Sequence, residues 1–205
     1  MMATMILDPE FARQLIAERA AWGGDRFDEV WEGTYMMSPL ANNEHQEIQS
    51  GLCAAIKNCL GWESRFIVLS GANISDREEE WEYNYRCPDV VVLAPNTKAK
   101  NCDTHWCGGP DFAVEIISPY DRSRDKFDFY GVVGVRELMV VDRKDWVLEF
   151  YRLLEDSLTL ETVVKVEDGK QVESQVLGVC FRLLGGEHRP KIEVQRSSGG
   201  EAWLI

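Results

Sequence analysis

The 205-residue sequence has no long apolar run, and its start lacks the basic residues and unbroken apolar stretch of a signal peptide. Its longest apolar strings, such as residues 90–94 and 138–141, are far shorter than the roughly 20 residues of a membrane-spanning helix. Residues 1–21 carry acidic side chains among apolar positions, which is typical of a surface helix. We therefore expect a soluble, cytoplasmic protein with no membrane partner.

Basic residues are scarce, because 22 Lys and Arg face 35 Asp and Glu, for a formal net charge of −13. Such a charge repels phosphate backbones at long range and argues against a nucleic-acid partner. However, residues 76–82 alone hold five of the acids and are typical of a solvated loop. Residues 121–128 balance three basic side chains against three acids. The composition therefore permits DNA binding that is weak, salt-sensitive and dependent on a metal ion.

The cysteines lack the regular spacing of a disulfide framework, and a chain of this length does not need disulfides for stability. We therefore expect free thiols. Cys102, His105 and Cys107 lie close together, with Cys87 upstream, so a zinc site is one interpretation. The other is a variable surface loop, since the spacing is not a common zinc pattern and residues 94–110 are rich in Lys, Asn, Asp and Gly.

The first half of the chain shows two helical patterns and several short strands. Apolar spacing predicts helices over 8–22 and 44–60, the second capped by Asn42 or Asn43 and ended by Gly61. Between them, residues 30–37 are expected to form a short strand or hairpin that turns at Glu32-Gly33. Residues 65–70 and 72–75 are expected to be two short strands.

The second half predicts a sheet that is covered on both faces. Residues 88–93, 112–117 and 135–141 are apolar, β-rich runs, and 121–133 is expected to be a helix after a break at Ser118-Pro119. The order strand, helix, strand implies two parallel neighbours. Residues 146–152 should return antiparallel, and 158–166 with 171–176 should form a hairpin around Asp168-Gly169.

Together these elements predict an α/β (α+β) fold with a mixed central β-sheet, helices on its faces and extra C-terminal β-hairpin strands. We expect a single domain over 1–205, with a core at about 28–153 and a C-terminal β extension at 154–205.

Two acids interrupt the apolar strands. Asp89 opens one strand directly after Pro88, and Glu115 lies in the middle of another. A buried carboxylate needs a partner, because leaving it unpaired costs several kcal/mol. If the two strands are neighbours, the carboxylates converge, and a divalent cation such as Mg²⁺ is the usual way to keep both ionised.

A third candidate lies eleven residues after Glu115. Lys126 falls in the first half of the predicted crossover helix, and Tyr130 is on the same helical face at i+4. A divalent ion together with a lysine near bound water is equipment for hydrolysing a phosphodiester. The alternative is that each residue is structural, with Asp89 paired to Arg86, Glu115 paired to Arg122 or Arg124, and Lys126 on the surface.

Five separated blocks of the sequence resemble the bacterial putative restriction endonuclease family, formerly of unknown function, in the PD-(D/E)XK nuclease superfamily. These blocks are Trp31 to Pro39, Glu44-His45-Gln46, Arg86-Cys87-Pro88-Asp89-Val90, Val114 to Pro119 with Asp121 to Tyr130, and Gly134 to Asp142. They stand in the family's order over about 120 residues from Glu32 to Arg152. The resemblance implies a restriction-endonuclease-like fold.

The resemblance also implies a site. Pro88-Asp89 stands where the family has its PD element, and Glu115 is the second acid. Ile117 occupies the superfamily's usual lysine position, and the family is similar to this chain in placing its lysine on the following helix, as Lys126 is placed. His45 matches a recurrent family histidine, which either approaches the metal or a phosphate or is structural. The expected catalytic residues are thus Asp89, Glu115, Lys126 and His45, with Asp89, Glu115 and Ile116 contacting Mg²⁺ or Mn²⁺.

The leading interpretation is a magnesium-dependent endonuclease that acts on DNA. A catalytically silent binding or assembly module and a hydrolase of small phosphate esters are the alternatives. A homodimer is expected, since many nucleases of this fold pair to reach both strands, and aromatic residues could form its face; the candidates are Trp62, Trp81, Trp106 and Trp146.

Overall fold

A six-stranded mixed sheet forms the centre of the computed structural model, which describes residues 4–38, 40–117 and 122–205. Its strands lie in the order β13-β12-β11-β10-β7-β4. Their bounds are β4 Ile67–Leu69, β7 Val90–Leu93, β10 Phe112–Ile117, β11 Glu137–Asp142, β12 Val147–Leu154 and β13 Ser157–Val164. The central mixed sheet is thus confirmed, and β13 extends it beyond residue 154.

The crossover unit is confirmed, because β10 and β11 pair in parallel and α3 (Phe127–Val133) lies between them in the chain. A 3₁₀ turn, Ser123–Lys126, precedes α3. Lys126 therefore lies in this turn and not in the first half of an α-helix, as the sequence predicted. The expected strand break at Ser118-Pro119 and the helix start at Asp121 fall outside the described residues.

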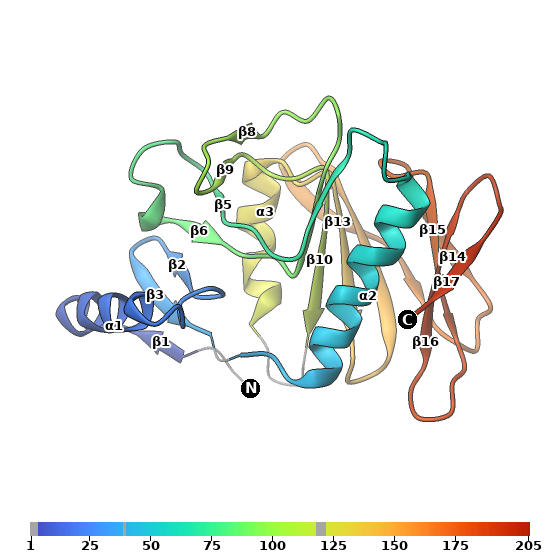
Figure 1. Ribbon diagram of the computed structural model, residues 1–205, viewed down its shortest axis with the longest axis horizontal. Helices are drawn as coiled ribbons and strands as arrows, with labels where there is room; N and C mark the ends of the chain where they lie inside the picture. The colour runs from blue at the N-terminus through green and yellow to red at the C-terminus, as the bar shows by residue number, and fades with distance from the viewer. Residues whose placement is uncertain (1–3, 39, 118–121) are drawn as a thin grey trace.

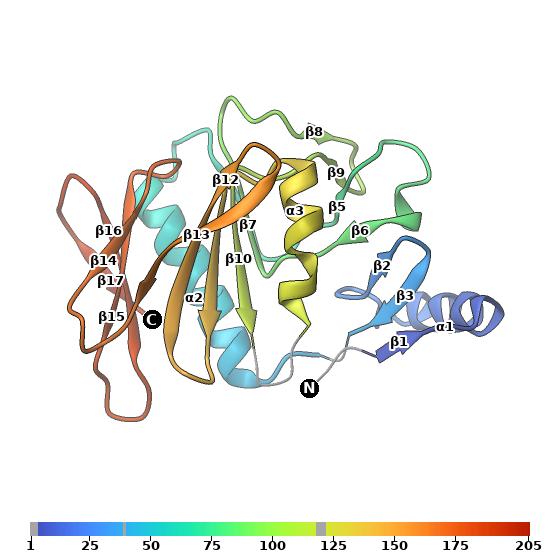
Figure 2. The ribbon, with the colours of Figure 1, turned by 180° about the vertical axis from the view of Figure 1, so that it is seen from behind.

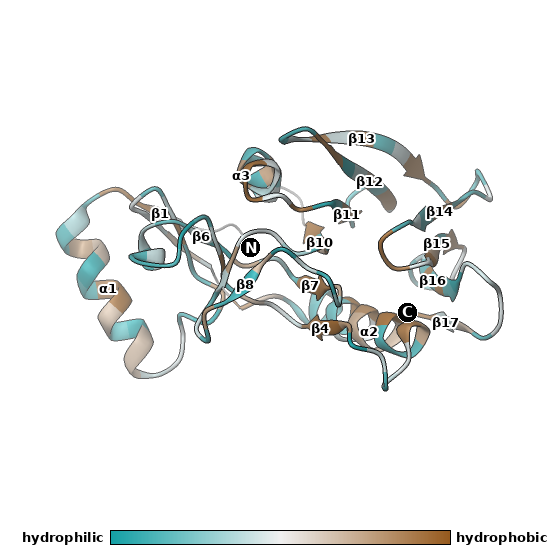
Figure 3. Cartoon of the chain, turned by 90° about the horizontal axis from the view of Figure 1, so that it is seen from above, coloured by the Kyte–Doolittle hydropathy of each residue, from teal (hydrophilic) through white to brown (hydrophobic). Residues whose placement is uncertain are grey.

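The two faces of the central sheet pack against different elements, as Figure 3 shows from above. Even-numbered residues of β10, such as Phe112 and Val114, share a core with α2 (Asn43–Leu60) and with the C-terminal strands. Odd-numbered residues, such as Ala113 and Ile117, share a second core with Tyr130 of α3. This alternation follows from the two-residue period of a strand. It also places Glu115 on the α3 face.

The N-terminal part forms a second, seven-stranded sheet in the order β1-β3-β2-β6-β5-β9-β8. The predicted hairpin of β2 and β3 is confirmed, with Glu32 and Gly33 at φ 48° and 82° in its turn. Figure 1 shows the N-terminal helix α1 at one end of the molecule. The bounds are β1 Thr4–Ile6, α1 Pro9–Ala21, β2 Glu29–Trp31, β3 Thr34–Met37, β5 Ile74–Ser75, a 3₁₀ turn Trp81–Tyr83, β6 Tyr85–Arg86, β8 Lys100–Asn101 and β9 Trp106–Cys107.

The C-terminal strands form a third sheet, at the opposite end from α1 (Figure 2). Its antiparallel order is β14-β15-β16-β17, with bounds Gln171–Ser174, Val179–Leu184, Lys191–Arg196 and Ala202–Leu204. The predicted hairpin around Asp168-Gly169 is wrong, because β13 and β14 belong to different sheets. β13 instead pairs with β12 across a turn at Glu155, which has a φ of 59°. The residues after β13 then carry the chain to the third sheet.

Close packing of α3 against the β12–β13 turn gives a stability prediction. A Cβ at Gly131 would lie 2.3 Å from the backbone oxygen of Asp156, so Gly131→Ala forces the helix and the turn apart. We expect this variant to lose about 1–3 kcal/mol of unfolding free energy, measured by urea denaturation. Val132→Ala is the control, because Val132 is 71% exposed on the same helix and should change little. Equal stability of both variants would contradict the packing.

Candidate active site

The pairing of β7 with β10 brings the two sequence-predicted acids together. Val90 lies opposite Val114, and continuing this antiparallel register by one residue places Asp89 beside Glu115. Directly opposed residues of an antiparallel pair have their Cβ atoms about 4.5–5.5 Å apart. Both carboxylates line one cavity of about 360 Å³, together with His45 and Lys126. The four predicted catalytic residues therefore share a cavity.

Asp89 is held from two elements. Its Oδ1 lies 2.8 Å from Nε2 of His45, and its Oδ2 accepts a 2.7 Å hydrogen bond from the backbone N–H of Ile116. His45 is in the first turn of α2, where Asn42 caps the helix by accepting a hydrogen bond from the His45 N–H. Gln49, one turn further along α2, donates to the backbone oxygen of Asp89. The start of α2 thus fixes the position of the carboxylate.

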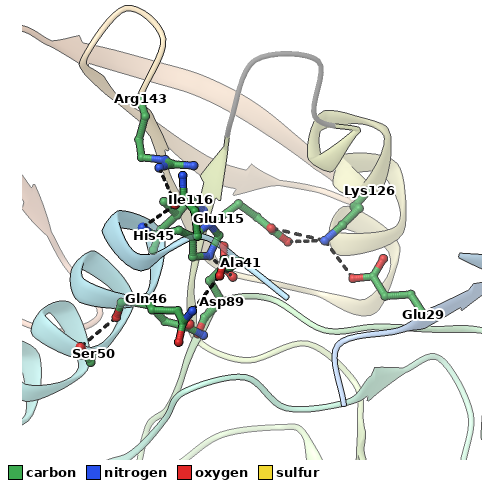
Figure 4. Close-up of polar contacts among 12 residues, drawn as sticks. Glu29, Ala41, His45, Gln46, Ser50, Asp89, Glu115, Ile116, Lys126 and Arg143 are labelled. Atoms are coloured by element: carbon green, nitrogen blue, oxygen red, sulfur yellow. Dashed lines mark hydrogen bonds and ion pairs between the residues drawn. The ribbon is translucent and has the colours of Figure 1, made fainter. Parts of the chain in front are cut away.

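Glu115 is bound from the α3 side, as Figure 4 shows. The ammonium group of Lys126 lies 3.0 Å from its Oε1 and 3.3 Å from its Oε2. The hydroxyl of Tyr130 donates to the same Oε1 over 2.5 Å. Lys126 and Tyr130 therefore both bind the carboxylate of Glu115, the acid in the middle of β10, and Tyr130 acts on that carboxylate and not on the ammonium group of Lys126.

A second carboxylate, Glu29, also binds Lys126 and was not among the predicted site residues. Its Oε1 lies 2.8 Å from the lysine Nζ and also accepts the backbone N–H of Cys87. Its Oε2 accepts the indole N–H of Trp31 at 2.7 Å. Glu29 is in β2 and is 4% exposed, so Lys126 lies between two buried acids from different sheets. Figure 4 shows the lysine pointing between them.

Burial and neighbouring charges shift the proton affinities in this cluster. Burial raises the pKa of Glu115 to about 8, and the negative charges of Asp89 and Glu29 add to the effect, while Lys126 opposes it. For Lys126 burial acts to lower the pKa, but Glu115 and Glu29 outweigh it and raise the pKa above its ordinary value. Burial also raises the pKa of Cys87 to about 12, so this thiol stays protonated.

The donor chemistry of the cavity fits Mg²⁺. Asp89 and Glu115 offer hard carboxylate oxygens, and Ile116, which has no donor side chain, offers only its backbone carbonyl. Within the described residues, no group of three or more His, Cys, Asp or Glu side chains is arranged to hold a metal ion. A magnesium ion here would therefore keep waters or substrate oxygens among its ligands, which is its common mode of binding.

The structure also places the residues of the zinc interpretation. Cys102 and Cys107 are free thiols near the short β8–β9 hairpin. The His105 ring is buried, with Nε2 3.0 Å from the backbone oxygen of Arg77, and it stacks on Trp81. His105 is thus engaged by a carbonyl group and an aromatic ring, and among the described residues it forms no group of three His, Cys, Asp or Glu side chains that could hold a metal ion.

The arginines that offered structural alternatives for the two acids have other partners. Arg86 donates to the backbone oxygen of Val30 and lies over the Trp31 ring. Arg122 pairs with Asp125, and Arg124 bridges Asp142 and Glu149. Glu115 is therefore neutralised by Lys126, and Asp89 faces His45 instead of Arg86.

The sequence does not distinguish Glu29 from Asp28, the acid that precedes it at the start of the same strand. Asp28 and Glu29 are adjacent acids at the start of one short strand, and both are buried. Asp28 has a structural role, since its carboxylate binds Arg19 and the hydroxyl of Tyr35. Only Glu29 reaches Lys126. The rule that identified Asp89, an acid at the start of an apolar strand, identifies both residues but does not separate them.

The central sheet, its crossover helix and the clustered carboxylates define a nuclease-like α+β protein. The model of the family described as "Putative restriction endonuclease" matches residues 20–183, and the chain belongs to this family. Among solved structures, the chain is similar to a putative nuclease belonging to DUF820 from Anabaena variabilis. That match has a TM-score of 0.57 and 16% identity, and it covers 72% of this chain and 80% of the other. A comparison with curated proteins found no match.

The predicted fold class and family are therefore confirmed. At 16% identity the Anabaena structure shows the shared fold alone. Among the residues that the structure describes, no helix combines the length and apolar character needed to cross a bilayer.

Proposed function

We propose that this protein is a Mg²⁺- or Mn²⁺-dependent endonuclease that hydrolyses phosphodiester bonds in DNA. The observation that carries the proposal is the meeting of Asp89, Glu115 and Lys126 in one cavity, on neighbouring strands and the crossover segment that follows. Membership of the family described as "Putative restriction endonuclease" supports nuclease activity and a nucleic-acid partner.

Each residue of the cavity has a separate role in the proposed reaction. Asp89 and Glu115, with the carbonyl of Ile116, would hold the metal ion, which when bound polarises a phosphoryl oxygen and lowers the pKa of a bound water. His45 orients the Asp89 carboxylate through the contact at Oδ1. Lys126 places a positive charge beside Glu115, where it neutralises negative charge that develops on the phosphate or orients the attacking water.

The direct test is cleavage of supercoiled plasmid by the purified protein. Mg²⁺ or Mn²⁺ should support nicking, EDTA should stop it, and a Glu115→Gln preparation purified in parallel should show only background. Absence of cleavage over a broad panel of DNA substrates, or equal cleavage by the variant, would refute the endonuclease proposal.

Two further measurements separate the alternatives. A silent binding module needs no metal, so calorimetric titration with Mn²⁺ should show no binding to it, whereas both hydrolase readings require binding. Hydrolysis of a small phosphate ester without DNA cleavage would favour the small-substrate hydrolase.

We also propose a homodimer, whose two sites would cut both strands of the DNA. Accumulation of nicked plasmid without linear product would contradict paired cutting.

A further inference from the structure

A second cavity adjoins the active-site cavity. It has a volume of about 270 Å³, and the two cavities share Arg26, Phe27, Ser70 and Cys87 in their walls. Cys87 is two residues before Asp89, so the shared wall begins about 7 Å along an extended chain from the proposed metal ligand. A substrate strand that reaches Asp89 can therefore continue past this wall into the second cavity.

Gly71 lines the second cavity beside two residues of the shared wall. A Cβ added to Gly71 would lie 3.4 Å from Cε1 of Phe27 and 3.5 Å from Sγ of Cys87. Its backbone φ of +80° also lies in the left-handed region that favours glycine. The ring of Phe27 and the thiol of Cys87 thus approach the glycine from two sides, where any larger side chain would fill the space between them.

Arg26 and Phe27 form a unit on this wall. The guanidinium carbon of Arg26 lies 5.4 Å from the centre of the Phe27 ring. Arg26 is exposed, and within the described part of the chain no carboxylate forms an ion pair with it. The neighbouring acid Asp28 is already bound to Arg19. In a protein with 35 acids and 22 basic residues, Arg26 is thus a cation left available for an anionic ligand.

We propose that this Arg26–Phe27 wall binds one unpaired nucleotide of the DNA strand next to the bond that is cut, with the base on Phe27 and its phosphate on Arg26. This inference rests on the proposed nuclease function. An aromatic ring beside a cation is the usual means of holding single strands. The cavity of about 360 Å³ is at the small end of ligand pockets and the one of about 270 Å³ is just below it, so both suit single nucleotides instead of a duplex. Asp103 lines the second cavity alone, whereas Arg26 lines both cavities, so the phosphate belongs beside Arg26.

The test is binding without cleavage. Fluorescence anisotropy of a labelled oligothymidylate and of a labelled hairpin duplex, both with Ca²⁺ in place of Mg²⁺ because Ca²⁺ also binds carboxylate oxygens, measures affinity for wild type, Phe27→Leu and Arg26→Gln. We expect wild type to prefer the single strand and Phe27→Leu to weaken its binding about tenfold. Arg26→Gln should reduce the slope of log affinity against log salt by about 0.7, the value for one phosphate contact in single strands. Arg13→Gln, an exposed α1 arginine, should match wild type.

Each outcome of the anisotropy measurement either supports the Arg26–Phe27 subsite or overturns it. Unchanged oligothymidylate binding in Phe27→Leu and Arg26→Gln, equal weakening by Arg13→Gln, or no binding by wild type would overturn it. Arg26→Gln removes no core packing, so it tests the site even if Phe27→Leu unfolds. Failure of this binding assay with intact plasmid cleavage would reject the subsite alone, whereas lack of metal-dependent cleavage would reject the nuclease function.

Discussion

Replacing Lys126 with methionine is expected to lower DNA cleavage by about 10²- to 10³-fold and to destabilise the protein by about 3–5 kcal/mol. The activity falls because the variant lacks the positive charge that faces the reacting phosphate. The stability falls because Glu29 and Glu115, 4% and 2% exposed, lose their shared counter-charge. Plasmid cleavage and urea denaturation measure the two effects separately.

The stability loss should also depend on pH. Burial already raises the pKa of Glu115 from 4.5 to about 8, and removal of Lys126 raises it further. Between pH 4.5 and about 8 both folded proteins hold a proton on Glu115 that the unfolded chain has released, so both lose unfolding free energy as the pH rises. Above pH 8 folded wild type has released this proton, whereas folded Lys126→Met retains it and continues to lose stability. The difference between wild type and Lys126→Met should therefore be larger near pH 9.5 than near pH 6.

Lys170→Met is the matched control, because the Lys170 side chain is 66% exposed. It should change neither cleavage nor stability measurably. If Lys126→Met cleaves plasmid like wild type, the lysine has no part in the reaction. If its stability loss is the same at both pH values, the buried carboxylates are not its cause.

The part of the site that the sequence predicted depends on strand register. The apolar runs that contain Asp89 and Glu115 are buried on both faces, so each acid is conspicuous in its own strand. Lys126 could be predicted because it lies in the segment that connects two parallel strands, and such a segment must return over the same sheet. Burial of the strands therefore identified the two acids, and chain connectivity identified the lysine.

The rest depended on partners far apart in the sequence. Glu29 joins the site only because its side chain, which comes from β2 of the seven-stranded sheet, reaches the ammonium group of Lys126 in the 3₁₀ turn. Likewise, Asp168-Gly169 is a valid turn signal, but β14 pairs with β15 in the third sheet and not with the outer edge of β13. The local sequence of the loop carries no information about which strand β14 pairs with.

The final prediction concerns Glu29, which we expect to hold Lys126 in position for the reaction. Glu29→Gln keeps the size of the side chain and an oxygen for the Cys87 N–H but removes the charge that faces the lysine. We expect a 10- to 100-fold lower kcat, as for residues that orient a reacting group through hydrogen bonds, with little change in KM. Glu32→Gln, an exposed acid in the turn of the same hairpin, is the control and should behave like wild type.

A double-mutant cycle distinguishes positioning from a general structural role. Because Lys126 compensates both acids, Glu29→Gln should relieve part of the destabilisation in Lys126→Met, giving a coupling of about 1–3 kcal/mol in unfolding free energy. In activity, the double variant should be no slower than Lys126→Met alone, since Glu29 acts only through that lysine. Additive losses in both measurements would show that Glu29 and Lys126 work independently. A rise in KM for Glu29→Gln as large as its expected loss of kcat would show that Glu29 acts on DNA binding and not on the reaction.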